Sequence, residues 1–105
     1  MKLLNQKTWI LDNIKACELA IQYHKETILG QLPYSKVIQR KGGCPFCNTA
    51  NKYHILCGSH NKCTFCCYQI LFNIPCKIFQ HKSESKARIV ELYFWIYTLK
   101  KLLSR

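Results

Sequence analysis

The chain has 105 residues, a length that fits one small domain. A core of this size gives limited stability, and the eight cysteines offer a metal ion or disulfides as the supplement. Sixteen lysine and arginine residues against five aspartate and glutamate residues give a formal net charge of +11, which disfavours a cationic partner and favours an anionic one. We therefore expect a single domain over residues 1–105.

The cysteines favour metal binding over disulfides. The first residues contain no apolar run long enough for a secretory signal, and residues 89–99, the most apolar stretch, are interrupted by Glu91 and too short to span a bilayer. The sequence thus predicts an intracellular, cytoplasmic protein without a membrane span. Cysteine pairs in that reducing compartment are more often metal ligands than disulfides.

Residues 1–32 are predicted to form an N-terminal helix. Thr8 or Asn5 would cap its start, and Gly30 followed by Pro33 would end it. Apolar residues recur every three or four positions and define one face, namely Trp9 or Ile10, Ile14, Cys17, Ile21, His24 and Ile28. On this face Cys17 and His24 are expected to be packing residues rather than ligands.

Residues 33–82 are predicted to form a zinc module whose main part, residues 42–78, is irregular. Gly42 and Gly43 allow a tight turn at its start. Residues 52–57 are interpreted as a possible short strand, and residues 64–73 as a short helix or a buried strand.

Two Cys-x-x-Cys pairs carry the strongest chemical signal. Fifteen residues separate them, a spacing typical of four-cysteine zinc sites. No carboxylate occurs between residues 27 and 83, so a metal site there must use cysteine or histidine. Asn48 is expected in the left-handed conformation, and Cys66 is expected to open a helix. The predicted ligands of one structural zinc ion are Cys44, Cys47, Cys63 and Cys66.

Other ligand sets stay open. Cys57 or His60 can replace one of the four cysteines, and a second site would use Cys57, His60, Cys67 and Cys76. Otherwise Cys67 and Cys76 are small buried hydrophobic residues. An iron–sulfur cluster uses the same thiolates, but the arrangement favours zinc.

Residues 83–105 are predicted to form a C-terminal helix, capped by Ser83 or Ser85. We expect it to pack on the N-terminal helix and on the zinc module, with a membrane-surface or partner-binding face as the alternative. The exposed side would carry Trp95 and Tyr97 as anchors for a partner. The expected buried face comprises Ile89, Leu92, Tyr93, Ile96, Leu99 and Leu103.

These motifs resemble two groups of proteins. Residues 42–76 are similar to zinc ribbons and treble clefs, which implies a zinc-stapled centre without implying a function. Most of the chain is similar to small uncharacterised phage proteins with a long N-terminal helix, two cysteine pairs and a later single cysteine, here Cys76. The present chain departs from them at Cys67 and at residues 73–75. That resemblance implies a viral accessory protein in the cytoplasm of a host cell.

Nucleic-acid binding is the first functional hypothesis. Phe46, Tyr53, Phe65 and Tyr68 lie among the central charges and are candidates for stacking on unpaired bases or for packing around the metal. The candidate phosphate contacts are Lys36, Arg40, Lys41, Lys52, Lys62 and Lys77.

The alternative is a protein-binding adaptor or inhibitor of a host nucleic-acid-processing or defence enzyme. We expect no enzymatic activity, because four protein ligands close a zinc shell and no nucleophile–base pair stands out. The chain is expected to be a monomer or a homodimer.

Overall fold

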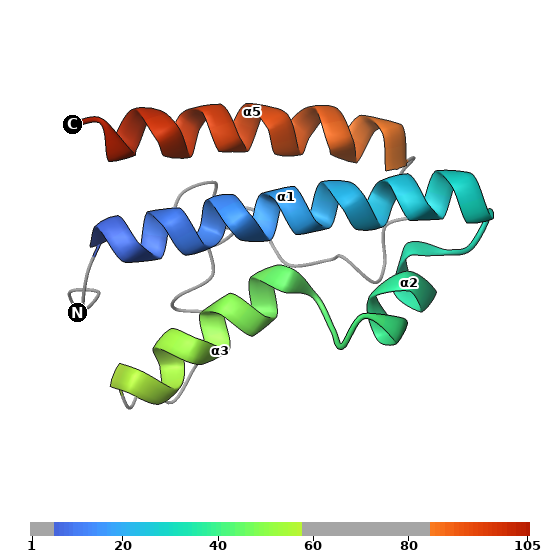
Figure 1. Cartoon of the computed structure of the whole chain (residues 1–105), viewed down its shortest axis with the longest axis horizontal. Coiled ribbons are helices and arrows are strands. Elements are labelled where there is room, and N and C mark those ends of the chain that lie inside the picture. The colour runs from blue at the N-terminus through green and yellow to red at the C-terminus, as the bar shows by residue number, and fades with distance from the viewer. Residues whose placement is uncertain (1–5, 58–84) are drawn as a thin grey trace.

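The computed structural model describes residues 6–57 and 85–105. Within them the chain is entirely helical, without a strand, which confirms the prediction of a small, mainly helical protein. The helix α1 is central: α5 runs antiparallel along one side of it, and α2 and α3 lie on the other side (Figure 1). The elements are α1 (Gln6–Gly30), α2 (Tyr34–Arg40), α3 (Pro45–Cys57) and α5 (Ser85–Leu103).

The bounds of α1 match the predicted N-terminal helix, but its end differs in detail. Gly30 is still helical, and the left-handed residue is Gln31, with φ 54°. The predicted face is largely correct, because Trp9, Cys17 and Ile21 are buried. Ile28 was predicted on that face and is instead 39% exposed, since α1 extends beyond its partners there.

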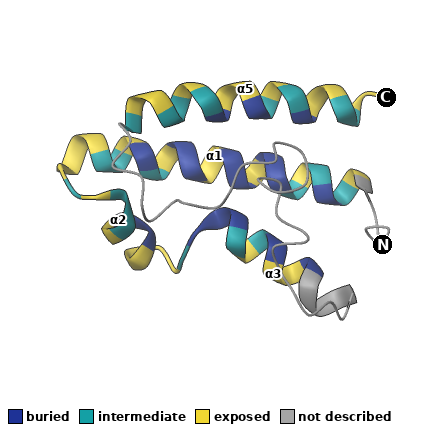
Figure 2. Cartoon of the chain, turned by 180° about the vertical axis from the view of Figure 1, so that it is seen from behind, coloured by how far each residue is buried: buried dark blue, intermediate teal, exposed yellow. Residues whose placement is uncertain are grey.

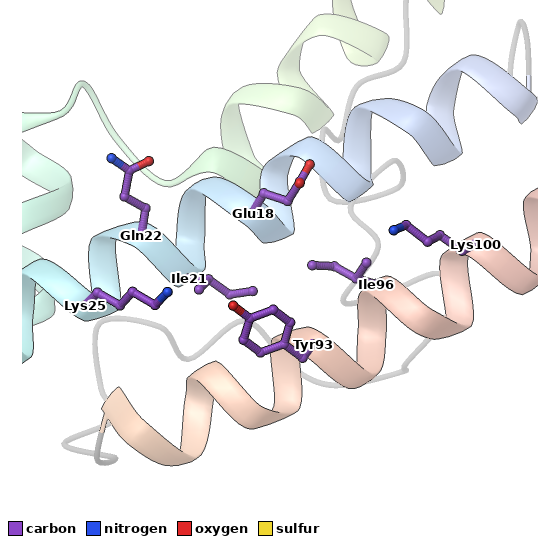
Figure 3. A pocket seen from close by; sticks show the side chains of 7 residues that line it. All are labelled: Glu18, Ile21, Gln22, Lys25, Tyr93, Ile96 and Lys100. Carbon is purple, nitrogen blue, oxygen red and sulfur yellow. The ribbon is translucent and has the colours of Figure 1, made fainter.

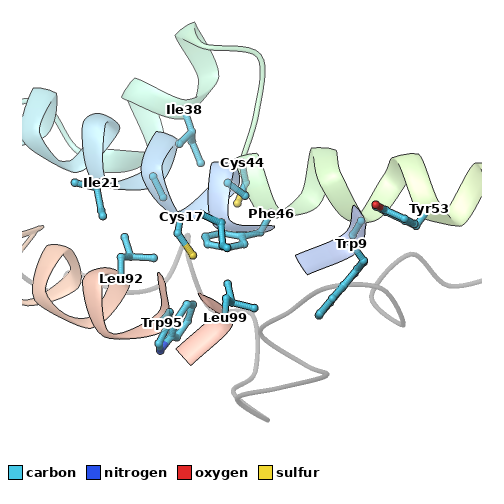
Figure 4. Close-up of a cluster of buried hydrophobic side chains, with 14 residues drawn as sticks. Trp9, Cys17, Ile21, Ile38, Cys44, Phe46, Tyr53, Leu92, Trp95 and Leu99 are labelled. Atoms are coloured by element: carbon cyan, nitrogen blue, oxygen red, sulfur yellow. The ribbon is translucent and has the colours of Figure 1, made fainter. Parts of the chain in front are cut away.

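The helix α5 was predicted with nearly correct bounds, and four residues of its predicted inward face, Ile89, Leu92, Ile96 and Leu99, do lie in or against the core. The prediction was wrong for Trp95 and Tyr93. Trp95, expected on the exposed side, is 3% exposed, whereas Tyr93, expected inside, is 53% exposed. Trp95 shares one helical face with Leu92 and Leu99, and burying this face removes the large indole from water. Trp95 also contacts the edge of Phe46 on α3, with ring centroids 6.0 Å apart (Figure 4).

The middle of the chain is more regular than predicted. Residues 34–40 and 45–57 are helical. The expectation of an irregular module from residue 42 onward is therefore wrong for residues 45–57, and so is that of a strand at residues 52–57. Phe46, Ala50 and Tyr53 recur at helical spacing and are buried, which explains why α3 forms against α1. Residues 64–73, interpreted as a helix or strand, lie outside the described residues.

No helix within residues 6–57 and 85–105 has the length and apolar composition needed to cross a bilayer.

Candidate metal centre and nucleic-acid interface

A glycine turn positions the first cysteine pair. Gly42 and Gly43 have φ angles of 92° and 112°, a region that residues with side chains rarely adopt. The Gly43 N–H donates to the carbonyl of Ile38 at 2.7 Å, which closes the end of α2. Cys44 then precedes α3, and Cys47 lies in the first turn of that helix. The predicted tight turn is confirmed.

The Cys44 and Cys47 side chains lie together at this turn. Their thiols are hydrogen-bonded to one another, and the backbone N–H groups of Phe46 and Cys47 donate to the Cys44 sulfur. The hydrogen bond from the Cys47 thiol and the burial of the side chain both raise the pKa of Cys44 above its ordinary value. Two adjacent sulfurs with backbone donors aimed at one of them fit half of a tetrahedral Cys₄ zinc site.

The remaining predicted ligands are only partly within the described residues. Cys63, Cys66, His60, Cys67 and Cys76 lie outside them. The cysteine, histidine and acidic side chains that the structure does describe form no group of three or more. The zinc ion and its full ligand set therefore stay a prediction.

Cys57 is the last residue of α3, and its side chain is outside the described part of the structure. Its role as a reserve ligand therefore stays a prediction.

Asn48 differs from its predicted role. It was expected in the left-handed conformation, but its backbone is helical and its N–H donates to the Cys44 carbonyl at 3.0 Å. Its side-chain Nδ2 donates to the Gly42 carbonyl at 3.4 Å. Gly42 and Gly43 supply the unusual backbone angles, so Asn48 is free to continue the helix.

The candidate phosphate contacts differ in whether an acidic side chain of the described residues pairs with them. Lys36 and Arg40 are exposed on one face of α2 and form no ion pair with a described residue. Lys41 pairs with Glu26 at 3.2 Å. Lys52 pairs with an acid on α1, and Lys62 and Lys77 lie outside the described residues. Lys36 and Arg40 are thus the described candidates best able to reach a phosphate.

The acid that engages Lys52 is Asp12. Its Oδ2 accepts from the Tyr53 hydroxyl at 2.7 Å and from Lys52 Nζ at 3.1 Å. Burial raises the pKa of Asp12, but these two hydrogen bonds together with the positive charges of Lys52 and Lys15 outweigh it, and the net pKa is lowered. Burial and the bond to Asp12 both raise the pKa of Tyr53. This group is a polar connection between α1 and α3, which sequence reasoning missed because 40 residues separate Asp12 from Lys52.

Two of the four candidate stacking residues of the central segment, Phe46 and Tyr53, are unavailable to bases. Phe46 and Tyr53 are 1% and 2% exposed and belong to the core (Figure 4). The expectation that they stack on bases is wrong, because the aromatic surface stabilises the packing of α3. Phe65 and Tyr68 lie outside the described residues.

Among the predicted partner anchors, only Tyr97 is on the surface, at 56% exposure. Sequence reasoning missed the two aromatic residues that accompany it, Tyr93 and Phe94. Their helical spacing from Tyr97 was the available signal.

Cys17 and His24 are packing residues, as predicted. Cys17 is fully buried, and burial raises its pKa to about 12. His24 stacks on Tyr34 with ring centroids 3.8 Å apart, and its Nδ1 is hydrogen-bonded to the Ser85 hydroxyl at 3.0 Å. Burial lowers the pKa of His24 to about 4, so its ring is neutral at neutral pH.

Comparison with protein-family models, with curated proteins and with solved structures finds no match to this chain. The resemblance to zinc ribbons, treble clefs and phage proteins is therefore neither supported nor contradicted.

Proposed function

We propose that this chain is a zinc-stabilised basic accessory protein, of viral type, that binds nucleic acid through its central basic segment. The observation that carries the proposal is the pair of exposed cations on α2 that form no ion pair with a described residue. Lys36 and Arg40 are four residues apart and therefore share one face of α2. The helix ends shortly before the turn that carries Cys44 and Cys47. Arginine and lysine on one exposed face are suited to adjacent phosphates.

The metal in this proposal has a structural role. The Cys44–Cys47 pair, with backbone donors at the Cys44 sulfur, supplies two of four thiolates, and Cys63 and Cys66 supply the others. A shell of four sulfurs has no open position for a substrate, so we propose no catalytic activity. Zinc would hold the turn after α2 and thereby the orientation of Lys36 and Arg40.

Charge reversal tests the proposal. Binding of a fluorescent DNA strand and of its duplex is followed by anisotropy over a range of salt concentrations. The wild-type affinity should fall steeply with salt, and K36E/R40E should weaken binding and reduce the slope of log K against log salt by about 2, about 0.7–0.9 for each lost phosphate contact. A matched control, K7E/K15E, makes the same charge change on α1 and should have the smaller effect. Equal effects of the two double variants would contradict a specific role for α2.

A protein-binding adaptor or inhibitor is the second candidate, and the exposed Tyr97 favours it. Aromatic interfaces persist in high salt, whereas phosphate contacts do not. Wild-type protein that fails to bind either nucleic acid at low salt would favour this second function over the first.

A further inference from the structure

The outward face of α5 carries an exposed aromatic stripe, defined by Val90, Tyr93, Phe94 and Tyr97. These side chains are 71%, 53%, 64% and 56% exposed, and their spacing places them along one side of the helix. The opposite side of α5 is buried against α1 through Leu92, Trp95 and Leu99 (Figure 2). The stripe is thus fixed on a rigid helix whose other face is already occupied.

Cations surround the aromatic stripe. Lys101 Nζ lies 4.9 Å from the centre of the Tyr97 ring, and Lys86 is exposed near the start of the helix. A groove of about 460 Å³ runs between α1 and α5 beside Tyr93 (Figure 3). Lys25 and Lys100 line it together with Glu18, which leaves a net positive charge. The surface therefore joins flat rings to a cationic groove.

We infer that the aromatic stripe is a binding site for single-stranded nucleic acid, with bases stacked on Tyr93, Phe94 and Tyr97 and phosphates held by the neighbouring lysines. This inference rests on the proposed nucleic-acid binding and specifies the single strand as its ligand. Tyr93 and Tyr97 are one helical turn apart, about 6 Å along the axis, so an extended strand can follow both. Bases paired in a duplex do not offer their faces to such rings.

The composition of the stripe favours this ligand over other anionic partners. A membrane-binding helix presents a continuous apolar face of leucine, phenylalanine or tryptophan, whereas two of the four stripe residues carry hydroxyl groups. Protein interfaces are depleted of lysine at their centres. Here Lys101 lies over the Tyr97 ring, and Lys25 and Lys100 line the same groove as Tyr93. Rings interleaved with cations are the arrangement typical of sites for unpaired strands.

The test replaces the rings without changing charge. Binding of an oligothymidylate of about 12 nucleotides and of a duplex is measured by anisotropy for wild type, for Y93L/F94L/Y97L and for the control L11A/L19A/L29A on α1. Leucine keeps the face apolar and the helix intact but cannot stack on a base. The leucine variant should bind oligothymidylate at least about 10-fold more weakly with an unchanged salt slope, whereas the control and duplex binding should change less than about 3-fold.

Several outcomes would overturn the inference. Unchanged oligothymidylate binding by a Y93L/F94L/Y97L variant with wild-type helicity would refute it while leaving the proposed function intact, provided that K36E/R40E is still impaired. A Y93A/F94A/Y97A variant guards against a folding effect of leucine and should show the same loss. If instead the alanine variant loses binding to phosphatidylserine vesicles and keeps its affinity for oligothymidylate, the stripe is a membrane-binding face.

Discussion

The α1–α5 pair and the arm formed by α2 and α3 (residues 34–57) differ in the polar contacts that supplement their apolar packing. Leu92, Trp95 and Leu99 pack on α1 through apolar contacts distributed along nineteen residues of helix. The arm also places Ile38, Phe46 and Ala50 in the apolar core, and it adds the hydrogen bonds of Asp12 and the paired thiols of its glycine turn. The two regions therefore share one apolar core. The α1–α5 pair adds the His24–Ser85 hydrogen bond, whereas the arm adds ion pairs with α1 and, as we propose, a metal.

Removing the proposed zinc should produce the largest difference between the two regions. Chelation, or C44S/C47S, should lower the zinc content from about one ion per chain to near zero and accelerate amide exchange in α3 far more than in α1 and α5. Binding of structural zinc contributes about 10–16 kcal/mol in zinc-finger peptides, so the arm should open when the zinc is lost. The control C17A should lose stability through a core cavity but keep its zinc. Wild-type protein purified without chelator and free of zinc would contradict the proposed metal centre.

Truncating Trp95 should destabilise both regions, because its ring contacts Phe46 of the arm as well as packing on α1. We expect Trp95→Ala to lower the free energy of unfolding by about 3–5 kcal/mol. Tyr97→Ala, two positions along the same helix but exposed, should cost less than about 1 kcal/mol. Denaturant unfolding followed by circular dichroism measures both values, and similar losses would show that the assigned inward face of α5 is wrong.

Lowering the pH should weaken the packing around His24, the residue of α1 that contacts Tyr34 of α2 and Ser85 of α5. Burial lowers the pKa of His24 from 6.5 to about 4, so the unfolded chain binds a proton more readily than the folded one in this range. The stabilising contribution is present above pH 6.5 and is lost as the pH falls toward 4, by at most about 3 kcal/mol. His24→Phe retains a ring against Tyr34 and should flatten this dependence. A parallel pH profile for the two proteins would exclude His24 as its source.

Local signals determined which elements could be predicted from the sequence. The bounds of α1 followed from its helical periodicity and from Gly30 and Pro33, and the first cysteine pair followed from its spacing. The inward face of α5 could not be chosen in the same way, because that helix is apolar around much of its circumference. Only the contact with Phe46 and α1 distinguishes Trp95 from Tyr93.

Long-range pairing explains what else the sequence could not show at the candidate site. Lys52 was predicted to contact phosphate as part of a basic segment without acids, but its partner Asp12 lies on a different helix. Similarly, Tyr53 was assigned to a possible strand. Its burial depends on the contact between α3 and α1, which the local sequence does not reveal. Lys36 and Arg40 could be predicted as surface cations because no such distant acid engages them within the described residues.

The burial of both indole rings makes intrinsic tryptophan fluorescence a probe of core packing in this protein. Trp9 and Trp95, the two tryptophans of the chain, are each 3% exposed within one apolar cluster. Their emission should therefore be blue-shifted while α1 and α5 remain packed, and should shift to the red when water reaches that cluster. Since neither the cations of α2 nor the rings on the outside of α5 include an indole, occupancy of those surfaces can be distinguished from unfolding without any attached dye.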